Sequence, residues 1–337
     1  MYNVAVIGLG DMGQTHLKGI YLKDTINLYG VCDLQEEKAR FCARKYNADK
    51  YYTDAKKLIE DEAVDIVIIA TYPSSHLELL SLCLENNKHV ICEKPIAKTY
   101  EEGLIFKRIC DEHPECKVLI GHILRHNKTY NKVYELIKND TIGSPIVMRM
   151  VQNHRIEKWD KYQKLIEETS PVIDCGVHYA DVMRWFTGAE VTSINGVGTK
   201  TVSSVPDGKY NHGMIHIGLS DGSVGFFEVG WSRTAENNSI KEFIGPKGRI
   251  EITYQKNRNI HKENGNLISV YRYPDNIAEY INVPFGEKPT GAELDYLIKM
   301  IEENIPACPT IEDALKSFKV VCEAEKTIIA NMAKKEI

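Results

Sequence analysis

The chain has 337 residues, of which 43% are hydrophobic and 26% charged, with a formal net charge of −5. This composition is ordinary for a globular protein of one or two domains, and the negative balance without a basic block argues against nucleic acid or an anionic membrane as a partner. No apolar run reaches the roughly 18 residues of a membrane span, and the chain enters its first predicted strand without a charged leader, so we expect a cytoplasmic protein. Nine scattered cysteines without a CxxC pair favour reduced, structural thiols.

The first predicted strand, residues 2–7, runs directly into a glycine-rich turn and then a helix over residues 14–23. The turn reads Gly-x-Gly-x-x-Gly, the pattern of a dinucleotide-binding turn when it joins a strand to a helix. The first glycine permits the tight turn, the second lets a pyrophosphate approach the backbone, and the third lets the helix pack closely. We expect the pyrophosphate to contact this turn and the helix N-terminus, at Gly8, Gly10, Asp11, Met12 and Gly13.

An acidic residue ends the second predicted strand. Residues 26–32 read as this strand, and Asp33 stands 20 residues after Gly13, where a carboxylate binds the adenosine ribose hydroxyls. Because Asp33 repels a ribose phosphate and no arginine follows it directly, we expect NAD rather than NADP. Further strands at residues 50–52, 65–70, 89–92 and 117–121 alternate with helices, which predicts a doubly wound parallel sheet over residues 1–121.

Polar residues follow two of these strands at the edge where ligands collect. Thr71 and Tyr72 end one strand, and His76 lies in the first turn of the helix that follows. Glu93-Lys94-Pro95 ends the next strand, where Pro95 restricts Lys94 to an extended backbone and can set a cis peptide. The candidate cofactor contacts at this edge are Thr71, Tyr72, His76, Glu93 and Lys94. For Lys94 two interpretations stand at this point: a rigidly held amine in a cleft, or half of a solvated Glu-Lys pair.

The second half, residues 122–337, has a different pattern. Strands are predicted at residues 146–154, 191–198, 213–219, 223–231 and 240–244, with turns between them, and helices at 131–139, 291–303 and 311–333. This indicates an α+β domain with a large, mostly antiparallel open sheet, and such a sheet favours a homodimer or homotetramer. His212 and His216 lack acidic partners in the sequence, so no metal site is predicted.

A polar stripe marks one helix of this domain. Ser170 followed by Pro171 is a good N-cap pair, and the helix is predicted to reach about Phe186. Asp174, His178 and Asp181 are spaced to share one face. A histidine beside a carboxylate suits general acid–base work on a hydroxyl, although a buried, satisfied His-Asp pair fits the same spacing.

Together these motifs resemble the Gfo/Idh/MocA family of NAD(P)-dependent oxidoreductases. The resemblance spans nearly the whole chain and rests on the glycine turn extended to His16, Ala70-Thr71-Tyr72-Pro73-x-x-His76, Glu93-Lys94-Pro95, Asp174-x-Gly176-x-His178-x-x-Asp181 and Gly245-x-Lys247-Gly248. It implies an N-terminal Rossmann domain and a substrate site beside the nicotinamide that is lined by Lys94, Asp174 and His178. Arg125 is kept as well, and His122, Asn153 and His154 are candidate substrate contacts for which structural roles stay open. Where many members have glycines, this chain has Glu167-Glu168-Thr169-Ser170, which implies a differently shaped substrate loop.

The function that follows is hydride transfer between a secondary hydroxyl of a polyol, sugar or glycoside and NAD. In this interpretation His178 takes the hydroxyl proton, Asp174 orients His178, and Lys94 donates to the developing negative charge on oxygen, although Lys94 could carry the proton instead. Two other classes remain open. One is sugar oxidation during glycoside cleavage, with NAD recycled in place or a partner lyase finishing the reaction; the other is a non-catalytic NAD-binding sensor.

Overall fold

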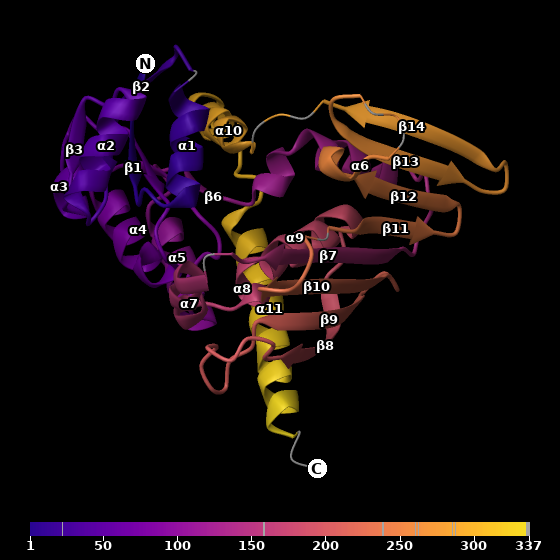
Figure 1. Cartoon of the computed structure of the whole chain (residues 1–337). Helices are drawn as coiled ribbons and strands as arrows, with labels where there is room; N and C mark the ends of the chain where they lie inside the picture. Colours follow the sequence, from indigo (N-terminus) through magenta and orange to yellow (C-terminus); the bar gives the residue numbers. More distant parts are fainter. Residues whose placement is uncertain are drawn as a thin grey trace. The chain divides into compact units, whose positions relative to one another are not determined.

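The computed structural model divides into two compact units (Figure 1). It describes residues 1–21, 23–157, 159–237, 239–259, 261, 263–284, 286 and 288–334. Unit 1 comprises residues 1–126 and 287–316, and unit 2 comprises residues 127–286 and 317–337. The predicted division into 1–121 and 122–337 is contiguous, whereas here a segment from the second half of the chain returns to unit 1.

Unit 1 is built on the predicted parallel sheet. Six strands follow the order β3-β2-β1-β4-β5-β6, and every neighbouring pair is parallel. The order reverses between β1 and β4, which is the switch point where ligands bind in doubly wound sheets. The strands are β1 (Tyr2–Ile7), β2 (Ile26–Cys32), β3 (Lys50–Tyr52), β4 (Ile66–Ile69), β5 (His89–Cys92) and β6 (Val118–Ile120).

Helices cover this sheet, as the alternation of strands and helices predicts. Because β4 and most of β5 are buried on both faces, they read as unbroken apolar runs rather than alternating ones. The first helix begins earlier than predicted, at Asp11 rather than Gln14, and its predicted end crosses Leu22, which lies outside the described residues. The helices are α1 (Asp11–Tyr21), α2 (Glu36–Tyr46), α3 (Ala55–Ile59), η1 (Pro73–Ser75), α4 (His76–Glu85), α5 (Tyr100–Glu112), η2 (Ile123–His126) and α10 (Thr290–Glu303).

Helix α10 joins unit 1 by packing on α1. Gly19 and Gly291 bring the two helices so close that a Cβ on Gly19 would lie 2.8 Å from the Gly291 nitrogen. The Thr290 hydroxyl donates to the Thr15 carbonyl (3.2 Å), and Leu297 packs into the core that contains β1 and β4. Helix α10 follows the strands of unit 2 along the chain, yet it packs in unit 1.

Unit 2 contains the predicted large sheet. Its eight strands follow the order β14-β13-β12-β11-β7-β10-β9-β8, and all neighbours are antiparallel except β10 and β7. Three of these strands, β12 to β14, are not predicted by the sequence pattern. The strands are β7 (Val147–Arg155), β8 (Val191–Thr199), β9 (His212–Leu219), β10 (Val224–Ser232), β11 (Lys241–Gly245), β12 (Gly248–Thr253), β13 (Asn266–Arg272) and β14 (Ile277–Val283).

Helices cover one face of this sheet (Figure 1). A Cβ on Gly176 of α9 would lie 2.7 Å from the Phe227 ring of β10, and a Cβ on Gly213 of β9 would lie 2.7 Å from Val172 of α8. The helices of this unit are α6 (Lys128–Lys138), α7 (Trp159–Glu168), α8 (Pro171–Asp174), α9 (Gly176–Thr187), η3 (Gln255–Asn257) and α11 (Ile311–Ala333), which begins in unit 1. In the described part of the chain, no helix is long and apolar enough to cross a membrane.

The opposite face of β7 to β10, which we call the open face, carries exposed apolar side chains. Side chains alternate between faces along a strand, and the residues next to the buried Phe227, Ile215 and Met148 point away from the helices. Between 38% and 48% of each apolar side chain is exposed there at Val147, Val197, Met214 and Val224.

Candidate functional site

The glycine turn has the geometry of a dinucleotide cradle. Gly8 has φ +87°, and a Cβ on Gly13 would lie 1.8 Å from the Gly8 carbonyl oxygen, so both positions require glycine. A Cβ on Gly10 would meet nothing within 4 Å, which leaves open space above the backbone where a pyrophosphate can approach. Since α1 begins at Asp11, its free N–H groups and positive dipole end lie at this space. The residues present therefore fit NAD.

Asp33 is held at the end of β2 beside this turn. Its Oδ2 accepts hydrogen bonds from the Leu9 amide (3.0 Å) and from the Lys38 amine (2.7 Å), and its Oδ1 accepts one from the Gln35 amide (3.1 Å). Burial pushes the pKa of Asp33 upward, but these hydrogen bonds together outweigh burial and lower it. The sequence analysis missed Lys38, five residues beyond Asp33, which puts a cation at the predicted ribose site.

The segment after β4 is tied together through His76. Ser75 does not cap α4; its hydroxyl bonds instead to Thr71 Oγ1 (2.7 Å) and the Tyr72 carbonyl (3.0 Å). His76 is fully buried, with Nδ1 3.0 Å from the Pro95 carbonyl and Nε2 3.3 Å from the Thr71 carbonyl, and burial lowers its pKa. A neutral His76 thus bonds to the segments that follow β4 and β5. Thr71 and Tyr72 are partly exposed at this edge.

Lys94 stands out from a buried segment at the end of β5. From Ile91 to Ala97 every residue except Lys94 is buried, and the Lys94–Pro95 peptide is cis, as the sequence allows. Behind Lys94, Glu93 Oε1 lies 2.7 Å from His16 Nε2, and both side chains are nearly fully buried. Burial would raise the pKa of Glu93, but the hydrogen bond and charge of His16 lower it, with a smaller contribution from Lys94. Glu93, predicted to contact the cofactor, therefore lies beneath the edge and Lys94 on it.

Two further predicted residues and one unforeseen one belong to unit 1. His122, predicted to contact substrate, is buried after β6, while Arg125 is partly exposed in η2. Lys288, just before α10, places its amine 3.5 Å from the Met12 sulfur in the glycine turn. An ammonium beside this turn can bind a pyrophosphate, and the distance of Lys288 along the chain hid it from sequence analysis.

In unit 2, Asp174 and His178 also stand out from a buried segment. Ser170 caps α8 by accepting from the Ile173 amide (3.2 Å), as predicted, and Gly188 ends α9 with φ +74°. The predicted single helix is nevertheless interrupted at Cys175, between α8 and α9. Among residues 171–180 only Asp174 and His178 are partly exposed. The Cys175 thiol lies 3.5 Å from Asp174 Oδ2.

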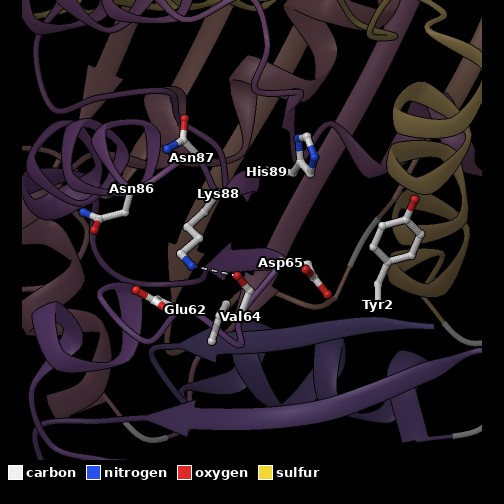
Figure 2. Close-up of a pocket in the computed structure, with 8 residues that line it drawn as sticks. All are labelled: Tyr2, Glu62, Val64, Asp65, Asn86, Asn87, Lys88 and His89. Atoms are coloured by element: carbon white, nitrogen blue, oxygen red, sulfur yellow. Dashed lines mark hydrogen bonds between the residues drawn. The ribbon is translucent and has the colours of Figure 1, made fainter.

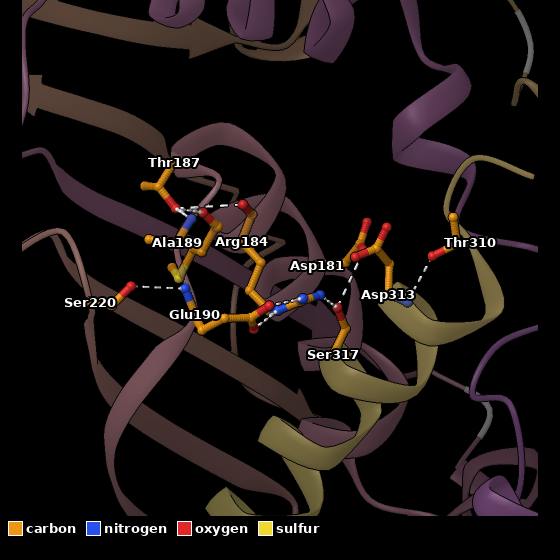
Figure 3. Close-up of polar contacts among 10 residues, drawn as sticks. Asp181, Arg184, Thr187, Ala189, Glu190, Ser220, Thr310, Asp313 and Ser317 are labelled. Carbon is orange, nitrogen blue, oxygen red and sulfur yellow. Dashed lines mark hydrogen bonds and ion pairs between the residues drawn. The ribbon is translucent and has the colours of Figure 1, made fainter.

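Asp181, third in the predicted polar stripe, has a structural place instead (Figure 3). It is 1% exposed and accepts a hydrogen bond from the Ser317 hydroxyl (3.3 Å). Ser317 in turn accepts from Arg184 (3.1 Å), which forms a two-pronged ion pair with Glu190 (2.9 and 3.0 Å). This network joins α9 to the part of α11 that belongs to unit 2, so of the stripe only Asp174 and His178 are partly exposed.

The end of β7 presents its polar residues to opposite faces. Gln152 and His154 point to the helix side, where their Nε2 atoms lie 2.7 Å apart and the Tyr179 hydroxyl bonds to Gln152. Asn153 points to the open face and donates to Glu228 (2.6 Å). Because side chains alternate along a strand, His154 lies on the same face as Tyr179 of α9, the residue next to His178, and Asn153 lies on the other face. Gln152 and Tyr179 are candidate site residues that the sequence analysis missed.

His212 does have an acidic partner, contrary to the sequence analysis. Its Nε2 lies 2.9 Å from Glu228 Oε1 on the neighbouring strand β10, and Asn153 bonds to the same oxygen. The partner is 16 residues away along the chain, and only the pairing of β9 with β10 brings it across. Within the described residues, no three His, Cys, Asp or Glu side chains are grouped to hold a metal ion.

A buried lysine supports the helix-side face of β7. Lys241 donates to the carbonyls of Val151 (2.6 Å) and Ile240 (3.0 Å) and to the Ser239 hydroxyl (3.1 Å), and its amine lies 4.6 Å from the Tyr179 ring centre. Burial lowers its pKa to about 7. Since Lys241 fixes the backbone one residue before Gln152, it supports the group that contains His154.

A hollow also lies at the opposite edge of the unit 1 sheet, at the amino ends of its strands (Figure 2). Its lysine, Lys88, is engaged with the carbonyls of Asp61 (2.9 Å) and Val64 (2.8 Å). Its His89 accepts from the Lys117 amide (3.0 Å). These contacts are structural, and the hollow contains none of the predicted site residues. It is lined by Tyr2, Glu62, Val64, Asp65, Asn86, Asn87, Lys88 and His89.

The doubly wound sheet, the glycine cradle and the acid at the ribose position define an NAD-binding oxidoreductase. Residues 2–122 match the model of an oxidoreductase family with an NAD-binding Rossmann fold, Gfo/Idh/MocA, and residues 130–251 match the C-terminal domain of that family. The chain belongs to the Gfo/Idh/MocA family, which confirms the resemblance seen in the sequence.

Similar proteins include inositol dehydrogenases. The chain is 27% identical over 303 residues to a myo-inositol 2-dehydrogenase from Thermotoga maritima, covering 85% of this chain and 89% of that protein. It is 27% identical over 254 residues to an NAD(+)-dependent scyllo-inositol 2-dehydrogenase from Bacillus subtilis, covering 74% and 72%. A scyllo-inositol dehydrogenase from Lactobacillus casei, solved with NAD(H) and scyllo-inositol, superposes with a TM-score of 0.81 at 20% identity over 98% of both chains, which shows a shared fold.

Proposed function

We propose that the protein is an NAD-dependent dehydrogenase that oxidises a secondary hydroxyl of a cyclic polyol, with an inositol as the first candidate. The observation that carries the proposal is the exposure pattern: Lys94, Asp174 and His178 each emerge from an otherwise buried segment. The buried neighbours fix the backbone at each of these three partly exposed polar side chains. The inositol 2-dehydrogenases among the relatives support the choice of substrate.

NAD+, held by the glycine turn and Asp33, supplies the hydride acceptor. His178 takes the proton from the substrate hydroxyl, and Asp174 orients His178 and binds a neighbouring hydroxyl. Lys94 donates a hydrogen bond to the substrate oxygen and stabilises the negative charge that develops there. His154 and Arg125 are proposed to bind further hydroxyls, for which charged and polar donors suit a substrate with many oxygens.

The test is NADH formation across a panel of inositols, sugars and glycosides with wild type, Lys94→Ala and Lys98→Ala. Lys98 is exposed four residues further on, which makes it the matched control. We expect wild type to turn over at least one inositol. Lys94→Ala should lower kcat by a factor of roughly 10²–10³, whereas Lys98→Ala should keep the wild-type kcat. A fully active Lys94→Ala variant would contradict the assignment. Glycoside cleavage without net NADH would indicate recycled NAD, and NADH binding without any turnover would indicate a sensor.

We also propose that the protein acts in the cytoplasm as a homodimer or homotetramer joined through the open face. The exposed apolar residues of that face support the assembly, because apolar side chains gathered on a sheet surface favour association with a second copy.

A further inference from the structure

A fully buried carboxyl group on α10 has no role in the proposed mechanism. Glu293 is 0% exposed, and neither carboxyl oxygen has a hydrogen-bond partner among the residues that the structure describes. It lies one turn into α10, which is held on α1 by the Thr290–Thr15 hydrogen bond and the Gly19–Gly291 approach. A carboxylate so placed is costly without a partner, so the group calls for an explanation.

A second buried acid, Glu93, interacts with Glu293. Glu93 is close enough to act on Glu293 electrostatically, and it already bonds to His16 at 2.7 Å. Space around Glu93 is tight, because a Cβ on Gly121 would lie 3.2 Å from its carboxyl group. Gly121 thus leaves room for the Glu93 carboxyl group beside His16.

Two buried carboxyl groups this close do not both ionise, and the contacts decide which one does. Glu93 has the hydrogen bond and charge of His16 and the nearby charge of Lys94, which lower its pKa despite burial. For Glu293, burial first and then the charge of Glu93 raise the pKa well above its ordinary value. These contacts favour Glu93 as the anion and Glu293 as the protonated acid. Glu93 is acted on by His16 on α1, Lys94 after β5 and His76 on α4. The 3-10 helix η2, which packs on α10, carries Arg125 and His126 and follows His122, and the His126 ring contacts Tyr296 of α10.

We propose that Glu293 is a positioning residue for Lys94. Glu293 acts as an uncharged acid behind the Glu93–His16 pair and sets an alkaline limit on activity. When Glu293 loses its proton, a second negative charge beside Glu93 disturbs the Glu93–His16 pair and with it the backbone that carries Lys94. The consequence for catalysis rests on the proposed function of Lys94, whereas the protonation of Glu293 does not.

The experiment compares wild type with Glu293→Gln and Glu303→Gln. Glutamine keeps the size of the side chain and cannot ionise, and Glu303 on the same helix is exposed and paired with Lys299, which makes it the control. We expect Glu293→Gln to keep most of its kcat/KM at pH 7 and to move the alkaline limb of the kcat/KM profile to higher pH. Glu303→Gln should follow the wild-type profile. A Glu293→Gln profile that superimposes on wild type, or a loss of more than about tenfold at pH 7 in a folded variant, would overturn the proposal.

Thermal unfolding tests the protonation independently of turnover. A carboxyl group whose folded pKa is raised contributes stability that is present below its unfolded pKa of about 4.3 and is lost as pH rises through the folded pKa. Glutamine does not ionise, so Glu293→Gln does not lose this stability as the pH rises. The difference between the Tm of Glu293→Gln and that of wild type should therefore grow above about pH 4.3, by roughly 2–4 °C over each pH unit. A constant difference would show that Glu293 is ionised and would overturn the proposal. An active Lys94→Ala variant would contradict only the proposed function, because the Tm comparison would still report the state of Glu293.

Discussion

At the scale of single residues, the proposed mechanism gives the substrate proton to His178 and a hydrogen-bond donor role to Lys94. A lysine that only donates a hydrogen bond can be replaced in part by arginine, which is always protonated, whereas a lysine that acts as base cannot. We therefore expect Lys94→Arg to keep measurably more turnover than Lys94→Ala. His178→Gln should lose roughly 10²–10⁴ in kcat and the acid limb of the pH–rate profile. If Lys94→Arg is as inactive as Lys94→Ala while His178→Gln keeps that limb, the two roles are reversed.

The pair formed by Asp33 and Lys38 makes a second prediction at this scale. Asp33 favours NAD by repelling a ribose phosphate, yet the Lys38 amine lies 2.7 Å from its carboxylate. In Asp33→Ser the lysine is released to bind a 2′-phosphate, so the ratio of kcat/KM for NADP over NAD should rise about tenfold to a hundredfold. The double variant Asp33→Ser/Lys38→Ala should lose that gain. An equal gain in both variants would show that Lys38 does not contact the cofactor.

What the sequence predicts at this scale depends on how local the determinants are. The glycine turn and the Ser170 cap need only their neighbours in the chain, and the structure has both as predicted. Asp33 directly follows β2, and its role at the ribose stays a prediction. The Glu228 partner of His212, the carbonyls around Lys241 and the burial of Glu293 arise from pairing between distant segments. One signal for Glu293 was present, because it falls on the apolar stripe of its helix with Leu294, Leu297 and Met300.

At the scale of elements, two glycines of the turn have different roles: Gly13 is required for packing, and Gly10 leaves space for the cofactor. A Cβ on Gly13 would overlap the Gly8 carbonyl, so Gly13→Ala must push α1 away from β1 and should cost at least about 3 kcal/mol of unfolding free energy. A Cβ on Gly10 meets nothing, so Gly10→Ala should change stability by less than about 0.5 kcal/mol. It should still weaken NADH binding by about tenfold or more, because the added methyl group occupies the approach of the pyrophosphate. Chemical denaturation and NADH fluorescence titration measure the two effects, and a stable Gly13→Ala or a tightly binding Gly10→Ala would contradict this division.

The strands with long apolar runs were predicted, whereas β12 to β14 were missed, although β12 alternates regularly between buried and outward residues. The buried strands β1, β4 and β5 follow from their apolar runs. Strand β14 is exposed along most of its length, and its sequence therefore lacks the alternation that marks a half-buried strand. The position where many relatives have glycines ends helix α7 here, since Glu167 and Glu168 favour helix. The break at Cys175 was missed although Gly176, a weak helix former, follows it directly, because the apolar pattern from Pro171 to Phe186 reads as one helix.

At the scale of the whole molecule, the open face of unit 2 predicts a homo-oligomer. A two-fold axis through β7 to β10 would bring Val147, Val224, Met214 and Val197 against the same residues of a second copy and remove their exposed apolar surface from water. The His212–Glu228 pair and the ring contact of His216 with Phe226 lie on the same face and would be buried with them.

Light scattering after size exclusion tests this assembly. The chain has a mass of 38.3 kDa, and we expect wild type to elute at a multiple of two of that mass. Met214→Glu/Val224→Glu places two carboxylates of each copy, four in all, in one self-complementary contact. The double variant should yield monomers with unchanged secondary structure, because both positions are solvent-exposed in the single chain. Phe41→Glu is the control, since Phe41 is 60% exposed on α2 of unit 1 and should not alter the assembly. A monomeric wild type, or a double variant that keeps the wild-type mass, would show that the open face is not the contact.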